Sequence, residues 1–161
     1  VTAAMEGTRP IMVEVQALAS PSSLAAPRRT SMGIDHNRLA LLVAVLEKKV
    51  GLSLLHQDIF VNAVGGVRIH EPGVDLAIAT AIASSFLDKP VDPQTVLLGE
   101  VGLTGEVRAI SRTDIRVAEA SKLGFRRCLL PQSNVERLPE VQSCEMIGVK
   151  SLQDVLSVLF D

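Results

Sequence analysis

Apolar and polar side chains alternate in the first part of the chain. Within residues 9–19, apolar Ile11, Val13 and Val15 alternate with polar Glu14 and Gln16. A period of two is typical of a β-strand with one buried face. Residues 20–33 are rich in Ser, Pro and Ala and contain no acidic residue, which predicts a loop with Arg28 and Arg29 at its basic tip.

Helical spacing begins after this loop. From Asp35 to Gly51, apolar residues recur every three or four positions. Asp35 is suited to cap the start of such a helix and Gly51 to end it. Residues 74–86 are rich in Ala and predict a second helix that is buried on most sides.

Two more helices are predicted in the second half of the chain. One spans residues 113–123 and is closed by Gly124. The other spans residues 152–160, where Ser151 is suited to cap the helix and Asp154 occupies the capping-box position.

The remaining apolar segments predict strands, and the first of them breaks at Gly65–Gly66, where a bulge or tight turn is expected. These segments are residues 58–69, 95–110, 126–131 and 144–149. The resulting order β, α, β, α, β, α, β, β, α predicts an α/β fold, or an α+β sandwich, in which helices cover a sheet. We expect one domain over residues 1–161, and the opening "VTAAMEGTRP" resembles the interior of a protein, so we expect that domain to come from a longer chain.

Composition narrows the function classes. The 161 residues are 47% hydrophobic, which is enough to bury a core, and no apolar run approaches the roughly 20 residues that span a bilayer. The formal charge is −2, so the chain has no overall basic signature of a nucleic-acid-binding protein. Aromatic residues are 2%, which excludes base stacking as the main binding mode. Nothing resembles a secretion signal, so a cytoplasmic location is the default.

Asp75 is a candidate for chemistry because it lies where a glycine-containing loop enters an apolar helix. As a general acid or base it would need a partner, and His70 and Glu71 are the nearby candidates. The alternative is a helix cap, in which the carboxylate accepts backbone N–H bonds and complements the helix dipole. The local sequence favours the cap.

Other chemistries find little support. The glycines match neither a phosphate-binding P-loop nor a dinucleotide-binding fingerprint, so nucleotide binding by this chain is not expected. His36, His56 and His70 are scattered without metal-ligand spacing, and Cys128 and Cys144 are too few and too far apart for a metal cluster. We therefore expect no metal site, and Cys128 is interpreted as a packing residue.

Charge is distributed unevenly along the chain. Residues 105–127 are locally basic, and phosphate contacts need only such a local patch. Arg112 and Arg116 are four residues apart and are expected on one helix face. A solvated face or a salt-bridged subunit contact is an equally good explanation for any single arginine. The stretch after residue 135 is acidic and contains Glu136, Glu140, Glu145, Asp154 and Asp161.

Five strings together resemble the C-terminal domain of the RadA/Sms family of bacterial DNA-repair proteins. They are "EGTRPIMVEVQAL", "RRTSMGIDHNRLALLVAVLEKKVGL", "NAVGGVRIHEPGVDLAIATAIASS", "LLGEVGLTGEVRAI" and "GFRRCLLP". That family joins a zinc finger and a RecA-like ATPase to a domain similar to the proteolytic domain of Lon. The resemblance implies a Lon-protease-like domain of the ribosomal-protein-S5-domain-2-like type, with ATP, Mg and Zn bound by modules that are not in this chain.

The Lon relationship implies that peptidase activity is lost. Lon peptidases use a Ser-Lys dyad, and "HEPGVDLA" resembles the serine string, which places Asp75 at the nucleophile and Gly73 on its glycine. "GEVRAISRTDIR" resembles the lysine string and places Asp114 at the general base. Two carboxylates cannot run acyl-enzyme chemistry of that kind. Ser84, Ser85 and Ser111 do not fall on the motif position.

The resemblance implies a scaffold that assembles a homohexamer and contacts single-stranded or branched duplex DNA during branch migration, with a RecA-type recombinase as a partner of the full-length protein. The DNA-contact candidates are Arg68 and Arg108 first, then Arg28 and Arg29, then Arg112 and Arg116. Arg68 and Arg108 are expected on strands beside the two dyad positions, on one face. The alternatives are a purely structural oligomerisation domain and an active peptidase with a displaced acidic dyad.

Overall fold

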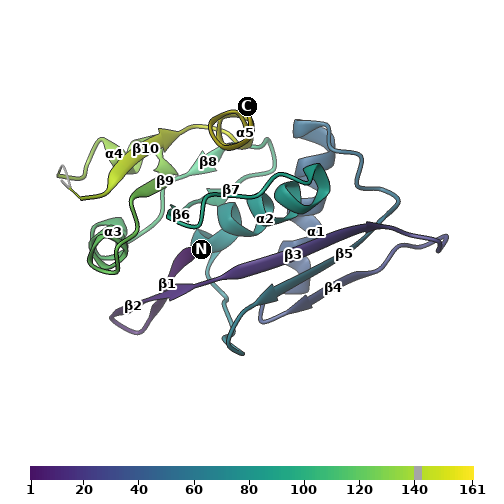
Figure 1. Ribbon diagram of the computed structural model, residues 1–161, viewed down its shortest axis with the longest axis horizontal. Helices are drawn as coiled ribbons and strands as arrows, with labels where there is room; N and C mark the ends of the chain where they lie inside the picture. The colour runs from purple at the N-terminus through teal and green to yellow at the C-terminus, as the bar shows by residue number, and fades with distance from the viewer. Residues whose placement is uncertain (140–142) are drawn as a thin grey trace.

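The computed structural model describes residues 1–139 and 143–161, so Glu140 of the predicted acidic stretch lies outside the described residues. Strands β3 (Val15–Pro21), β4 (Arg29–Met32) and β5 (Gln57–Ala63) form a sheet in the order β3-β5-β4 (Figure 1). β5 is antiparallel to β3 and parallel to β4. One face of this sheet is buried because Ile59, Val61 and Ala63 alternate inward along β5.

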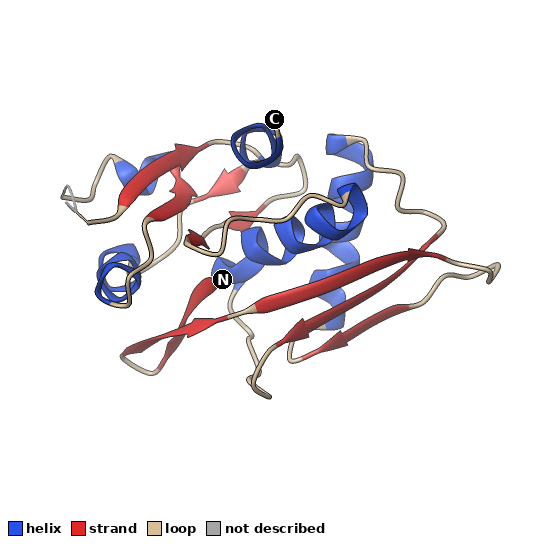
Figure 2. Ribbon diagram, viewed as in Figure 1, coloured by secondary structure: helices blue, strands red, loops and turns tan. Residues whose placement is uncertain are grey.

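Two helices cover that buried face. α1 (His36–Val45) continues into a π-helical turn, η1 (Leu46–Val50), and packs against β4. α2 (Asp75–Leu87) follows a 3₁₀ turn, η2 (Pro72–Val74), and lies along β3 (Figure 2). Leu39, Leu42, Ile78 and Ile82 are at most 1% exposed, so the main core lies between these helices and the sheet.

The C-terminal half forms a second, parallel sheet. Its order is β10-β9-β6, from β6 (Thr95–Leu97), β9 (Arg127–Pro131) and β10 (Glu145–Val149). Helices α3 (Thr113–Lys122), α4 (Gln132–Val135) and α5 (Leu152–Phe160) surround it. A second apolar cluster, which includes Val96, Val117 and Leu130, lies between α3 and this sheet.

Two hairpins complete the fold. β1 (Thr2–Glu6) pairs antiparallel with β2 (Arg9–Val13), and the short strands β7 (Glu100–Val101) and β8 (Val107–Arg108) pair with each other. Thr2 also donates through its hydroxyl to the Leu97 carbonyl at 2.8 Å, so the first hairpin is tied to the second sheet. No helix among the described residues is long and apolar enough to cross a membrane.

The predicted mixed α/β class is confirmed, and so are most helix boundaries. The Asp35 side chain accepts from the Asn37 N–H, and Gly51 closes the first helical segment with a φ of 84°. Gly65 and Gly66 have φ values of 93° and 72°, as a tight turn requires. The Ser151 hydroxyl accepts from the Asp154 N–H at 3.1 Å, as predicted.

Four details of the prediction are wrong. The strand expected over residues 9–19 is interrupted at Glu14, and the loop expected over 20–33 shrinks because β3 runs to Pro21 and β4 begins at Arg29. The first strand, β1, was not predicted, because its five residues show no alternation of apolar and polar types. The Asp154 carboxylate accepts from the Lys150 N–H rather than that of Ser151, so the capping box is incomplete.

Candidate functional site

The two strings that resemble the Lon dyad meet at the start of α2. At this junction the Gly73 carbonyl accepts from the Gly99 N–H at 2.9 Å, and the Gly99 carbonyl accepts from the Leu76 N–H at 3.0 Å. A side chain at Gly73 would lie 3.4 Å from Ile110 and 3.5 Å from Arg116. The turn η2 is therefore packed directly against the segment that leads into α3.

Asp75 is buried at this junction and paired with a cation. Its side chain is 1% exposed, and the guanidinium of Arg38 contacts both carboxylate oxygens, with Nε 3.2 Å from Oδ1. The Val101 N–H also donates to Oδ2 at 3.1 Å. Burial raises the pKa of the Asp75 carboxyl above its ordinary value, although Arg38 and the Val101 N–H oppose that shift.

The predicted role of Asp75 as a helix cap is wrong. Asp75 is the first residue of α2, but its carboxylate accepts no N–H of that helix and bonds instead to α1 and β7. The partner Arg38 was missed because it lies 37 residues away in the sequence and no local pattern points to it. Of the catalytic partners considered, His70 is exposed, and Glu71 is bonded elsewhere.

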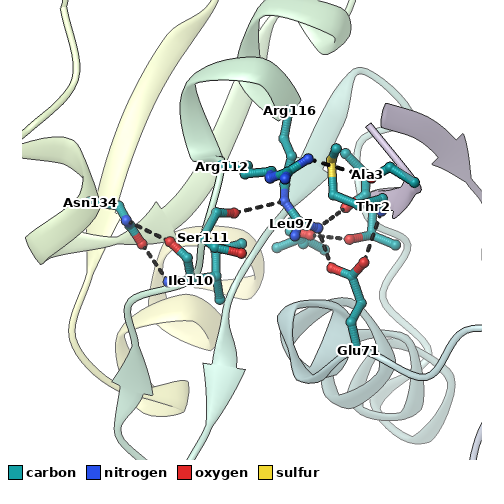
Figure 3. Close-up of polar contacts among 11 residues, drawn as sticks. Thr2, Ala3, Glu71, Leu97, Ile110, Ser111, Arg112, Arg116 and Asn134 are labelled. Carbon is teal, nitrogen blue, oxygen red and sulfur yellow. Dashed lines mark hydrogen bonds and ion pairs between the residues drawn. The ribbon is translucent and has the colours of Figure 1, made fainter. Parts of the chain in front are cut away.

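Arg116 is the centre of a second buried network (Figure 3). Its guanidinium donates to the Ala3 carbonyl at 2.8 Å and to the Ser111 carbonyl at 3.1 Å, and it pairs with Glu71. Glu71 in turn accepts from the Met5 N–H at 2.8 Å. One side chain of α3 thus ties together β1, the residue that precedes η2, and the connection before its own helix.

Arg116 therefore cannot serve as the predicted DNA contact. Its side chain is 3% exposed, and its Nε and Nη1 groups donate to protein acceptors. The shared face expected with Arg112 is also wrong, because Arg112 precedes the helix with a φ of 57° and is exposed. Four-residue spacing predicts a common face only when both residues are inside the helix.

Asn134 fixes the segment before α3 from the other side. Its amide donates to the Ile110 carbonyl at 3.1 Å, and its oxygen accepts from the Ile110 N–H at 2.9 Å (Figure 3). Sequence reasoning missed this residue, because it lies on the four-residue helix α4. The Asn134 side chain thus bonds both backbone groups of Ile110, as a neighbouring strand would.

Asp114, at the second dyad position, is exposed on the first turn of α3. Among the described residues, no hydrogen bond or ion pair joins it to Asp75. The two carboxylates thus have different surroundings: one is buried and paired, and the other faces solvent. An exposed carboxylate on the first turn complements the helix dipole.

The remaining DNA-contact candidates are on the surface to different degrees. Arg68 is exposed in the loop between β5 and η2, and not on the strand predicted for it. Arg108 is on β8 with 58% of its side chain exposed and a loose ion pair of 3.9 Å with Glu106. The two residues belong to different elements, and their expected position on one face stays a prediction.

Arg28 and Arg29 divide into one exposed and one engaged side chain. Arg28 is 64% exposed, pairs with Asp58 at 3.4 Å, and lies 5.8 Å from the centre of the Phe60 ring. Hydrogen bonding to the Arg28 N–H lowers the pKa of Asp58. Arg29 is half-buried and donates to the carbonyls of Leu54 and Gln57, which leaves it little freedom to contact phosphate.

The two cysteines are buried, which confirms the packing role of Cys128. They are nevertheless close in space, with 3.3 Å between the sulfur atoms. Burial raises the pKa of the Cys128 thiol, so it stays protonated. Within residues 1–139 and 143–161, no three His, Cys, Asp or Glu side chains are grouped as a metal ion would require.

Comparison with known proteins gives two results. The family model described as "Subunit ChlI of Mg-chelatase" matches residues 34–134. The chain is also 54% identical over 158 residues to "DNA repair protein RadA" of Halalkalibacterium halodurans, 54% over 156 residues to that of Bacillus subtilis, and 47% over 156 residues to that of Streptococcus pneumoniae. These matches cover 97–98% of this chain but 34–37% of the relatives, so the chain spans about a third of their length.

Proposed function

Because this chain belongs to the ChlI family and corresponds to a C-terminal RadA domain, we propose that it is a non-proteolytic, Lon-like scaffold of a DNA-repair protein. In this proposal it promotes assembly of a hexameric ring and contacts DNA during branch migration. The ATPase activity, the bound ATP, Mg and Zn, the cytoplasmic location and any RecA-type partner belong to the proposal for the full-length protein.

The observation that carries the proposal is the state of the two dyad positions. The carboxylate of Asp75 is paired with Arg38 in the protein interior, and Asp114 is exposed at a separate place. Acyl transfer needs a nucleophile activated by an adjacent base, and a buried, ion-paired carboxylate supplies neither. The junction is instead suited to holding α1, α2 and β7 in a fixed arrangement, as a scaffold requires.

The DNA role is supported by the exposed arginines and by the names of the relatives, each a "DNA repair protein". Arg68 and Arg108 have exposed guanidinium groups that are free or only loosely paired. Each phosphate that such a cation neutralises releases counterions, so a few of them give measurable, salt-dependent binding without an overall positive charge.

Binding of labelled branched and duplex DNA, titrated at several salt concentrations, tests the DNA role. Arg68→Ala and Arg108→Ala should each weaken binding and reduce the salt slope by about one unit. Arg137→Ala is the matched control, because Arg137 is also exposed but is not among the proposed contacts. If both variants bind like the wild type, those residues are not the contacts.

Two alternatives give different results in simple assays. A purely structural ring former would assemble but would bind no DNA at low salt. An active peptidase with a displaced acidic dyad would cleave an unstructured substrate such as casein, and that cleavage would disappear in Asp75→Asn. We expect neither the wild-type protein nor Asp75→Asn to cleave this substrate.

A further inference from the structure

A groove of about 930 Å³ is lined by β3 and α2, and its lining extends to Thr30 and Met32 of β4 and to Phe60 and Asn62 of β5. Val15 and Ala17 of β3 form one wall, and Ala77 and Ala81 of α2 form the other. Thr80 also lines the groove, and its hydroxyl is the one buried side-chain oxygen without a hydrogen-bond partner among the described residues. The small side chains leave room for a polypeptide backbone to come close to β3.

The hydrogen bonds of β3 show which of its groups face this groove. The Val64 N–H donates to the Glu14 carbonyl at 3.0 Å, and the Ser22 N–H donates to the His56 carbonyl at 2.8 Å. Even-numbered residues of this strand therefore bond towards β5. In an antiparallel ladder the intervening residues direct N–H and C=O to the opposite edge.

That opposite edge is open over a short length. The Ala19 N–H is satisfied by the Ser85 hydroxyl at 2.9 Å. Val15 and Ala17 direct their backbone groups to the same edge, and β3 has no strand on this side among the described residues. Two residues thus offer the donors and acceptors of an unpaired strand edge, which is the usual basis for adding a strand to a sheet.

The register of β1 leads directly to this open edge. β1 pairs with β2 so that Thr2 faces Val13 and Ala4 faces Ile11, and each pair of residue numbers adds to 15. Only Glu14 separates β2 from β3, and in Figure 1 β1 lies on the side of this long strand opposite β5. If the chain that precedes Val1 continued β1 in the same register, it would pair with β3. The first residue before Val1 would face Val15, and the third residue before Val1 would face Ala17.

We propose that the open edge of β3 is a docking site for the segment that precedes β1 in a protein of RadA length. The relatives are about three times as long as this chain, so such a segment exists in them. It would pair antiparallel with Val15 and Ala17 and would place small apolar side chains against Ala77 and Ala81. The Ser85 bond to Ala19 closes the edge and sets the end of the added strand.

This docked strand would fix how the preceding part of the protein leaves the domain. A linker paired with a sheet loses the freedom of a flexible tether, because its direction is set by the strand. The docking site is defined by the register of β1, the groove beside β3 and the length of the relatives. It is independent of the DNA role, and its test involves no DNA.

Amide hydrogen exchange tests the docking site by comparing residues Val1–Asp161 alone with the longer protein that carries its native preceding residues. Exchange at Ala17 should be slower in the longer protein by about tenfold or more, while exchange at Leu18, which bonds towards β5, should be slow in both. Equal exchange at Ala17 in the two proteins would overturn the proposal.

A proline scan gives a second readout. Ala17→Pro removes an N–H that faces the groove and leaves the ladder with β5 in place, so it should lower the melting temperature of the longer protein more than that of Val1–Asp161. Leu18→Pro, the matched control, breaks the ladder with β5 and should destabilise both equally. If Ala17 in Val1–Asp161 becomes protected as protein concentration rises, a second copy fills the groove and the proposal is wrong.

Discussion

At the residue scale, two arginines hold carboxylates from distant parts of the chain. Arg38 pairs with Asp75 and Arg116 pairs with Glu71, across 37 and 45 residues of sequence. Removing one partner of a buried pair leaves an uncompensated charge or unsatisfied polar atoms, which costs more than the intact pair contributes. Both pairs therefore fix the position of the segments that they join, and they add little to the net free energy of unfolding.

Replacement of Arg38 by Met should destabilise the fold by about 3 kcal/mol at neutral pH, the lower end of the range for a buried pair, because Arg38 is itself partly exposed. Folding raises the pKa of Asp75, so protonation of this carboxyl stabilises the folded state. This contribution to the free energy of unfolding is fully present below the ordinary carboxyl pKa and is lost as pH rises through the pKa of the folded protein. Without Arg38 that pKa rises further, and the penalty of the variant should shrink on acidification. Urea unfolding at several pH values measures this.

The double variant Arg38→Met with Asp75→Asn is the control for this prediction. It has no carboxyl at residue 75 to ionise, so its stability relative to the single variant Asp75→Asn should lack the pH dependence that Arg38→Met shows relative to the wild type. A penalty for Arg38→Met that is the same at every pH would contradict the burial of an ionised Asp75.

Replacement of Arg116 by Met should cost about 3 to 5 kcal/mol, since the carbonyls of Ala3 and Ser111 and the Glu71 carboxylate lose their donor. Arg112→Met, at an exposed arginine four residues earlier, should change stability by less than about 0.5 kcal/mol. Thermal unfolding of the two variants measures the contrast. Weaker DNA binding by folded Arg116→Met, with unchanged stability, would instead support the original surface prediction.

At the element scale, helices were easier to predict than strand pairing. The start of α1 and the end of η1 depend on Asp35 and Gly51, whose effects are local and visible in sequence. β1 and the break at Glu14 depend on which strands lie beside them, and a short apolar segment carries no such information. Asp75 and Asp114 could be assigned to the starts of their helices because those signals are local. The roles of Arg38 and Asn134 could not be predicted, because they depend on contacts with residues far away in the sequence.

Removal of the α5 cap tests a prediction made from sequence and confirmed in the structure. Ser151→Ala should destabilise the domain by about 1 kcal/mol, because the Asp154 N–H loses its acceptor. Ser157→Ala, in the exposed middle of the same helix, should be neutral or slightly stabilising, since Ala has the higher helix propensity. Equal effects of the two changes in a denaturant titration would show that the cap contributes nothing.

At the scale of the whole molecule, the fold combines an ion-paired junction with a surface that carries a few exposed arginines. The mixed α/β class could be predicted from the order of elements, while the Lon-like assignment remains a prediction from the resemblance. A ring built from head-to-tail contacts needs two different complementary surfaces on each subunit. The uneven charge of the sequence is compatible with such surfaces, and assembly is the property that separates a scaffold from an isolated binding domain.

The mass of the domain in solution tests the central claim most directly. Size-exclusion chromatography with multi-angle light scattering, run on residues Val1–Asp161 over a range of concentrations, measures that mass without reference to shape. The scaffold proposal predicts a species with six times the 17.2 kDa of one chain. A monomer at every concentration would contradict it and would assign ring assembly to the rest of the full-length protein.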